Sequence, residues 1–123
     1  MRLLLDTHIF LWVTMDSPQL TVKARQLIED ADEVYVSAVS VWEVAIKARL
    51  GRIQADAHEL AEAIEPSGFR ELPVTATHAA GVGQLPLHHH DPFDRLLVAQ
   101  ALAEPLRLVT ADAVLAQYSD LIL

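Results

Sequence analysis

The sequence begins Met1-Arg2-Leu3-Leu4-Leu5-Asp6-Thr7, and this stretch decides the fold. Three consecutive leucines predict a short strand that is buried on both faces. Asp6 marks the point where that strand leaves the core. The same pattern returns far along the chain, where Leu106-Arg107-Leu108-Val109-Thr110 is followed by Ala111 and Asp112. The two stretches predict two short apolar strands, each followed closely by an aspartate.

Strand and helix patterns alternate between these two stretches. Val34-Tyr35-Val36 predicts a second strand, because β-branched and aromatic residues favour extended structure, and residues 69–74 predict a weaker one. Helices are predicted over residues 21–30, 38–50, 55–64 and 93–103. Leu121-Ile122-Leu123 is a candidate last strand. Short apolar strands separated by helices are typical of a parallel sheet covered on both faces, so we predict a single α/β domain over residues 1–123.

Composition restricts the classes of protein to be considered. The chain has 123 residues, of which 52% are apolar, so one domain can bury a substantial core. No apolar run approaches the roughly 18 to 20 residues that span a bilayer, so we expect no membrane partner. The lack of cysteine excludes disulfides and thiolate metal sites and fits a reducing, cytoplasmic location. A net charge of −8 argues against an open basic groove for nucleic acid, although cations bound to clustered carboxylates would offset part of it.

Two aspartates are candidate site residues because of where they follow strands. Asp6 and Asp112 come at or just after the carboxyl ends of predicted parallel strands, which is where α/β sheets form their sites. Each also has a structural interpretation, because aspartate is a favoured N-cap for a following helix. Neither residue alone indicates a particular chemistry.

Glu43 is the third candidate, because it interrupts an apolar helical face that includes Val39 and Ile46. A carboxylate in such a place must be paired, bound to metal or neutralised. Lys47 lies four residues later, in the favourable orientation for a Glu–Lys ion pair, and this pair is the structural alternative.

Asp94 is the fourth candidate, in the first turn of the helix that begins at Asp91-Pro92. The helix dipole alone stabilises an acid there by ~0.3–1 kcal/mol. Asp91 has the stronger structural interpretation, because aspartate before proline is an ordinary cap. We therefore interpret Asp94 as a metal ligand and Asp91 as its support, with Arg95 positioned to hold a carboxylate or a phosphate.

The histidines give a weaker signal. His88-His89-His90 would not converge on one ion, because adjacent side chains point in divergent directions. We interpret them as a polar loop near the site, with a metal or substrate role as the alternative. His8 is a candidate for lining the site, and His58 and His78 are predicted to lie on helix surfaces.

Four blocks of the sequence together resemble the PIN domain, specifically the VapC-type toxins of bacterial and archaeal toxin–antitoxin pairs. The blocks are Leu3-Leu4-Leu5-Asp6-Thr7-His8, Val36-Ser37-Ala38-Val39-Ser40-Val41-Trp42-Glu43, His90-Asp91-Pro92-Phe93-Asp94-Arg95-Leu96-Leu97-Val98-Ala99-Gln100-Ala101 and Val109-Thr110-Ala111-Asp112. The resemblance covers nearly the full length and implies a three-layer α/β/α fold with a mostly parallel sheet of about five strands. It carries the acidic quartet of the family onto Asp6, Glu43, Asp94 and Asp112. Supporting hydroxyls of the family fall on Thr7, Ser37 and Thr110.

This resemblance implies an endoribonuclease, a toxin homodimer and inhibition by a VapB-type antitoxin. The acidic quartet would hold Mg²⁺, with Mn²⁺ as a substitute, because both ions prefer oxygen ligands. Candidate contacts to RNA phosphates are Lys47, Arg49, Arg52 and Arg95, for which a solvated helix face is the alternative. An apolar patch around Phe10 and Trp12 is a candidate surface for an antitoxin helix, although core packing is the better interpretation for Phe10.

Two other functions are considered. A non-catalytic PIN-like module that binds RNA or a partner has the same fold without cleavage. A haloacid-dehalogenase-type phosphotransferase also places an aspartate after its first strand, but that chemistry needs a second aspartate two residues later, where this chain has His8.

Overall fold

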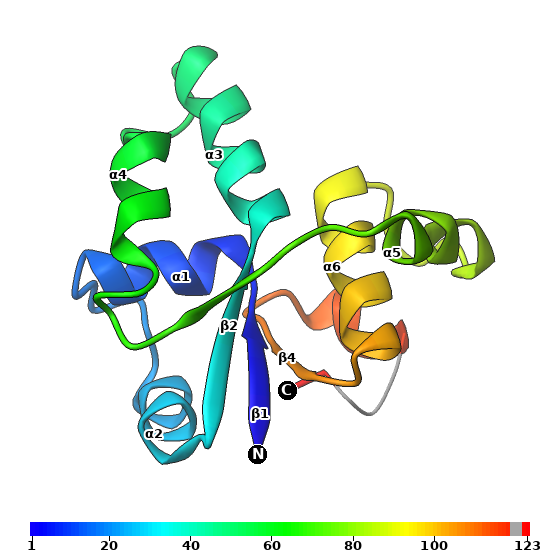
Figure 1. The fold of residues 1–123 in the computed structure, drawn as a ribbon, viewed down its shortest axis with the longest axis horizontal. Coiled ribbons are helices and arrows are strands. Elements are labelled where there is room, and N and C mark those ends of the chain that lie inside the picture. The colour runs from blue at the N-terminus through cyan, green and yellow to red at the C-terminus, as the bar shows by residue number, and fades with distance from the viewer. Residues whose placement is uncertain (119–121) are drawn as a thin grey trace.

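A parallel sheet of four strands forms the centre of the computed structural model, which describes residues 1–118 and 122–123 (Figure 1). The strands are β1 (Arg2–Leu5), β2 (Glu33–Ser37), β3 (Arg70–Leu72) and β4 (Arg107–Val109), in the order β3-β2-β1-β4. The register pairs Leu5 with Val36 on one side and with Val109 on the other. The carboxyl ends of β2, β1 and β4 therefore meet at one edge of the sheet.

The predicted last strand falls partly on residues 119–121, which lie outside the described residues. Ile122 forms a single parallel bridge with Leu108 of β4. Within the described residues the sheet has four strands and one bridge, close to the five strands predicted, and its parallel character is confirmed.

Helices begin almost immediately where strands end. The helices are α1 (Thr7–Thr14), α2 (Val22–Asp30), α3 (Ala38–Arg49), α4 (Ala57–Ala63), α5 (Ala76–Gly81) and α6 (Pro92–Ala103), with 3-10 segments η1 (Val82–Gln84) and η2 (Ala113–Tyr118). Asp6 alone separates β1 from α1, and Ser37 is both the last residue of β2 and the N-cap of α3. Polar side chains at these junctions satisfy the free N–H groups of a helix start. The same residues are thereby fixed at the carboxyl edge of the sheet.

Two hydrophobic cores lie on opposite faces of the sheet and make the three layers. Leu3 and Leu5 pack with residues of α1, α2 and α4, whereas Leu4 packs with residues of α6 and η2. All three leucines are fully buried, and burying each contributes about 1.5–3 kcal/mol. Successive side chains of a strand point to opposite faces, so one run of three leucines serves both cores. Figure 1 shows α1, α2 and α4 to the left of the sheet, α3 above it, and α5 and α6 to the right.

The side chains of Phe10 and His78 are both buried. Phe10 is 1% exposed in the first core, as core packing predicts, while Trp12 is partly buried against that core. The placement of His78 on a helix surface is wrong, because this side chain is 2% exposed. Its Nε2 atom lies 2.5 Å from Glu104 Oε2, and its Nδ1 atom accepts a hydrogen bond of 3.1 Å from the Thr75 N–H. The histidine therefore completes the N-terminal cap of α5 from inside.

Within residues 1–118 and 122–123, no helix combines the length and the apolar character that crossing a bilayer requires.

Candidate metal centre

Asp6 is held in the buried junction between β1 and α1. Its side chain is 5% exposed, and its Oδ1 atom accepts a hydrogen bond of 2.8 Å from the Ile9 N–H. Its Oδ2 atom accepts a hydrogen bond from the Thr110 hydroxyl, which follows β4. Burial raises the Asp6 pKa, and the hydrogen bonds from Thr110 and Ile9 oppose that rise. Asp6 thus caps the N-terminus of α1 and also lies at the carboxyl edge of the sheet.

Thr110 connects Asp6 to Asp112. The Thr110 Oγ1 atom donates to Asp6 and accepts a hydrogen bond of 3.0 Å from the Asp112 backbone N–H. The Asp112 Oδ1 atom in turn accepts from the Val114 N–H at 3.0 Å, which caps the start of η2. The supporting role predicted for Thr110 therefore has a geometric basis: one hydroxyl ties together the acids that follow β1 and β4.

Glu43 is 2% exposed on α3, where the sequence predicts an acid within an apolar face. The Thr7 hydroxyl donates to its Oε1 atom at 2.6 Å, and Lys47 forms an ion pair with its Oε2 atom. The i,i+4 pair is therefore present. Burial acts to lower the Lys47 pKa, but the hydrogen bond and the charge of Glu43 outweigh it and raise that pKa. The Lys47 ammonium neutralises Glu43, and it is not a free contact for phosphate in this structure.

Asp94 lies in the first turn of α6, as predicted, and Asp91 is the N-cap. The Asp91 Oδ1 atom accepts from the backbone N–H groups of Phe93 at 2.8 Å and Asp94 at 3.1 Å. The pKa of Asp94 rises from 3.8 to about 6, first because of burial and then because of the negative charges of Asp91, Glu43 and Asp6. The acids of β1, α3 and α6 thus share one electrostatic environment.

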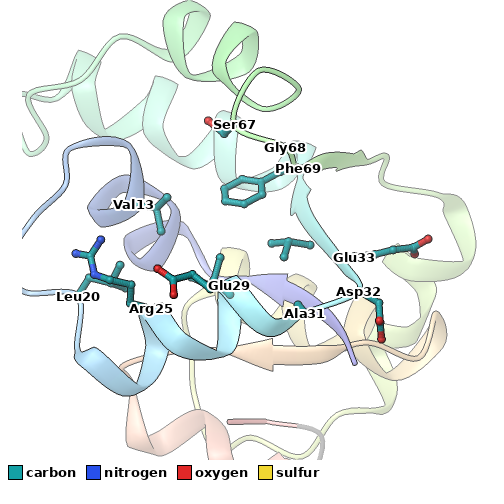
Figure 2. A pocket seen from close by; sticks show the side chains of 12 residues that line it. Val13, Leu20, Arg25, Glu29, Ala31, Asp32, Glu33, Ser67, Gly68 and Phe69 are labelled. Carbon is teal, nitrogen blue, oxygen red and sulfur yellow. The ribbon is translucent and has the colours of Figure 1, made fainter.

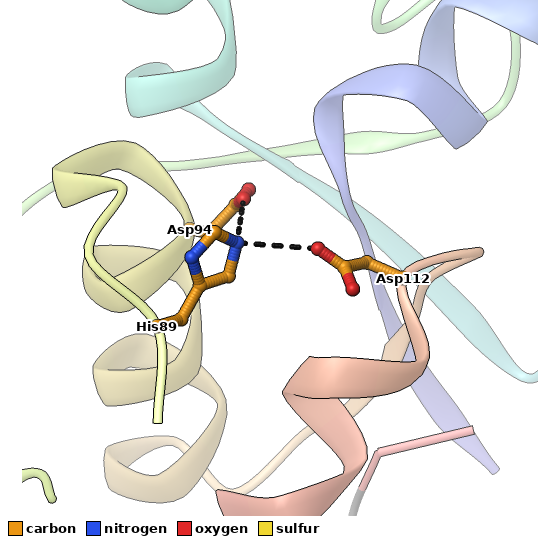
Figure 3. Close-up of side chains that lie close together, drawn as sticks. All are labelled: His89, Asp94 and Asp112. Atoms are coloured by element: carbon orange, nitrogen blue, oxygen red, sulfur yellow. Dashed lines mark ion pairs between the residues drawn. The ribbon is translucent and has the colours of Figure 1, made fainter. Parts of the chain in front are cut away.

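A histidine joins Asp94 to Asp112 (Figure 3). The His89 Nε2 atom lies 3.1 Å from Asp94 Oδ2 and 3.2 Å from Asp112 Oδ2. One ligand atom from each of these three residues lies within 4.8 Å of the others, and among the described residues this group meets the spacing expected of a shared ion. The predicted polar loop near the site is thus present, and the sequence did not single out His89 from its two neighbours. No spacing distinguishes three consecutive identical side chains.

These donors fit a hard divalent cation. Carboxylate oxygens are the preferred ligands of Mg²⁺ and Mn²⁺, and all four predicted acids cluster around the carboxyl edge of the sheet. The oxygens of Asp6 and Glu43 already accept hydrogen bonds, but a carboxylate oxygen has a second lone pair for another partner. Asp94 and Asp112 have side chains that are 21% and 40% exposed, so these two acids face the solvent from which an ion arrives.

The remaining predicted residues have other surroundings. The Arg95 guanidinium donates to the carbonyl oxygens of Pro86 at 3.0 Å and Val82 at 3.1 Å, and to the Tyr118 hydroxyl at 3.2 Å. It therefore anchors the loop before α6, and it pairs with none of the four carboxylates. Ser37 is fully buried and its hydroxyl accepts from the Val39 N–H at 3.0 Å, so it supports the start of α3. Arg49 and Arg52 are exposed at and beyond the end of α3.

A pocket of about 380 Å³ lies at the other end of β2, away from this centre (Figure 2). Phe69 and Val13 line it together with charged residues. Three of these charges are paired: Arg25 with Asp16, Glu33 with Arg2 and Arg70, and Asp32 with the chain's amino group. The pocket shares no residue with the acidic centre.

Comparisons with known proteins identify the family. The PIN domain profile matches residues 3–121. The chain is 37% identical to Ribonuclease VapC22 of Mycobacterium tuberculosis (strain ATCC 25618 / H37Rv) over 115 residues, which cover 89% of this chain and 85% of that protein.

Solved structures agree in fold. VapBC2 from Rickettsia felis, bound to a promoter DNA fragment, superposes with a TM-score of 0.68 at 17% identity, covering 99% of this chain and 96% of that chain. FitAcB from Neisseria gonorrhoeae superposes with a TM-score of 0.66 at 22% identity, covering 96% and 93%. The shared fold, the family profile and the relative of similar length lead to one conclusion: the chain belongs to the PIN domain family, among its VapC-type members.

Proposed function

We propose that this protein is a metal-dependent endoribonuclease and the toxin component of a VapBC-type toxin–antitoxin pair. The observation that carries the proposal is that Asp94 and Asp112 lie, together with His89, close enough to share an ion, while the charges of Asp6 and Glu43 act on Asp94. The name of its relative, Ribonuclease VapC22, supports the activity. The acidic quartet matches the chemistry that phosphodiester hydrolysis requires.

The four acids divide the work of holding an ion. Asp94 and Asp112 would hold it directly, and Asp6 and Glu43 would hold it directly or through water. A bound Mg²⁺ or Mn²⁺ would lower the pKa of a coordinated water and stabilise charge on the phosphate. Thr7 and Thr110 orient Glu43 and Asp6 through their hydroxyls, and Lys47 compensates the charge of Glu43.

Besides the ion, hydrolysis of the phosphodiester needs only water and the carboxylates of this chain. The oxygen of a water molecule bonds to phosphorus, the bond from phosphorus to the ribose oxygen breaks, and the leaving ribose oxygen takes up a proton from solvent. One carboxylate of the quartet takes the proton of the attacking water as general base. Exposed Arg49 and Arg52 remain candidates for contacts with RNA phosphates beyond the scissile bond.

A protein partner is the second part of the proposal. A VapB-type antitoxin fits the solved neighbours, which are described as VapBC2 from Rickettsia felis and as a toxin–antitoxin complex from Klebsiella pneumoniae. The net charge of −8 favours a partner that presents basic side chains to the acidic centre. On α3, Trp42 is 55% exposed and Ile46 is 37% exposed, so an apolar surface is available for a second subunit in a cytoplasmic homodimer.

The experiment that tests the activity is cleavage of total RNA by purified, antitoxin-free protein with Mn²⁺, with Mg²⁺ and with chelator. The variant Asp6→Asn removes one acid of the quartet. Asp56→Asn is the matched control, because Asp56 caps α4 as Asp6 caps α1 and asparagine is an equally good cap.

We expect cleavage that requires metal and Asp6 and is unchanged in Asp56→Asn. Folded protein that binds RNA but cleaves none with either metal would favour the non-catalytic binding module instead.

A further inference from the structure

His89 is fixed in place by its own backbone. Its N–H group donates to the Tyr118 hydroxyl at 2.9 Å, and its carbonyl oxygen accepts from Arg95 Nη1 at 3.3 Å. The same guanidinium holds Val82 and Pro86 of the preceding segment. The backbone of His89 is thus anchored by contacts that do not involve the acids.

The hydrogen bonds of the ring decide which nitrogen carries the proton. Two backbone N–H groups point at Nδ1, from His90 at 2.9 Å and from Asp91 at 3.3 Å. Because both are donors, Nδ1 must accept and has no proton of its own. The proton of the neutral ring is therefore on Nε2.

The Nε2 atom lies between two carboxylates of different elements. It is shielded from solvent, 3.1 Å from Asp94 Oδ2 on α6 and 3.2 Å from Asp112 Oδ2 before η2 (Figure 3). Neither Asp94 Oδ2 nor Asp112 Oδ2 has hydrogen-bond geometry with this N–H group. The N–H group thus has no hydrogen-bond partner among the described residues, and it lies within 3.2 Å of two acids that otherwise repel each other.

The spacing of Asp94 and Asp112 is close enough for the two acids to share an ion. Oxygens on opposite sides of an ion at about 2.1 Å lie about 4.2 Å apart. One carboxylate oxygen of Asp94 and one of Asp112 lie within 4.8 Å of each other. A carboxylate oxygen has two lone pairs, so it can accept from His89 and still bind metal.

We propose that His89 is a positioning residue, whose Nε2–H group holds Asp94 and Asp112 at the spacing that the ion requires. This inference rests on the proposed metal-dependent function, and it assigns to the loop before α6 a role beyond connecting two elements. His89 is not itself a ligand through Nε2, because that atom carries the proton. Hydrogen-bond donors of this kind to ligating groups typically contribute 10- to 100-fold to metal affinity.

The test measures Mn²⁺ affinity directly, without RNA, from the electron paramagnetic resonance signal of free Mn²⁺. The variants are His89→Ala, His89→Gln and His90→Ala. His90→Ala is the matched control, because it removes an exposed imidazole from the same loop and keeps the backbone N–H that contacts His89. Circular dichroism confirms that each variant is folded.

We expect His89→Ala to bind Mn²⁺ 10- to 100-fold more weakly than the wild type, and His90→Ala to bind equally well. His89→Gln should recover part of the affinity, because its side-chain amide also donates an N–H group. Wild-type affinity in His89→Ala would overturn the inference alone, and tighter binding would show that the histidine competes with the ion.

Nitrogen coupling to bound Mn²⁺ that disappears in His89→Ala would also overturn it, by making His89 a direct ligand. A wild-type protein that binds no Mn²⁺ would overturn both this inference and the metal dependence on which it rests.

Discussion

Replacing Asp94 with asparagine should stabilise the metal-free protein at neutral pH. The folded protein raises the pKa of Asp94 from 3.8 to about 6, so the ionised form is disfavoured by folding. The contribution of protonated Asp94 to the free energy of unfolding is fully present below pH 3.8. It is lost as the pH rises to about 6 and the side chain ionises. Above that pH the wild type is destabilised by the full cost of holding an ionised Asp94 in the folded protein, and Asp94→Asn avoids that cost.

The size of the gain follows from the shift in pKa. At 1.36 kcal/mol per unit, a shift of about two units corresponds to about 3 kcal/mol. Solvent reaches this side chain, which is 21% exposed, and screening reduces the effect to about 1–2 kcal/mol. The expected gain is therefore about 1–2 kcal/mol, or roughly 4–8 °C in melting temperature.

Thermal unfolding in the presence of chelator, at pH 8 and at pH 3.5, measures the difference between variant and wild type. Asp56→Asn serves as control, because Asp56 is an exposed acid at the start of α4. We expect Asp94→Asn to gain stability at pH 8 and not at pH 3.5. A variant that is less stable than the wild type at pH 8, or equally stabilised at both pH values, would refute the electrostatic reasoning.

Three further changes have defined outcomes. Mn²⁺ at 100 times its dissociation constant for the wild type should stabilise the wild type by about 2.7 kcal/mol in thermal melts. The same stabilisation of Asp94→Asn at that Mn²⁺ concentration would contradict a role for Asp94 as ligand. Lys47→Met leaves the buried Glu43 charge unpaired and should lower the free energy of unfolding, measured in urea, by roughly 3 kcal/mol. Lys47→Arg should retain most of the stability. Equal stability of the wild type and both variants would mean that the ion pair is not formed. Thr110→Val removes a donor to Asp6 and an acceptor for Asp112, and should cost about 1–3 kcal/mol and slow RNA cleavage, whereas Thr110→Ser should behave as the wild type.

The strands and the acids that follow them were predictable from the sequence because both depend on local patterns. Leu3 to Leu5 are buried on two faces, and Asp6 must then leave the core at the edge of the sheet. The pair between Glu43 and Lys47 was predictable for the same reason, because helical spacing alone brings these side chains together. Such local blocks also carry the resemblance to the PIN family and its three layers.

Residues whose roles depend on distant parts of the chain were not predictable in this way. The side chain of Arg95 anchors the carbonyl oxygens of a loop, and its position on a helix carries no information about those partners. His78 lies in a helix of six residues, too short for periodicity to reveal its inner face. His89 is one of three equal neighbours, and backbone donors on its own loop select the ring that faces the acids.

The bond between Thr110 and Asp6 spans 104 positions of the sequence and has a consequence for synthesis on the ribosome. A nascent chain presents Asp6 early, but β4, Thr110 and Asp112 emerge about a hundred residues later. Until then β1 lacks its neighbour β4, and the acids that follow these two strands cannot meet. We therefore expect the unfinished polypeptide to be harmless to the RNA around it, and the nuclease to be assembled only after the ribosome has translated the segment that carries Asp112.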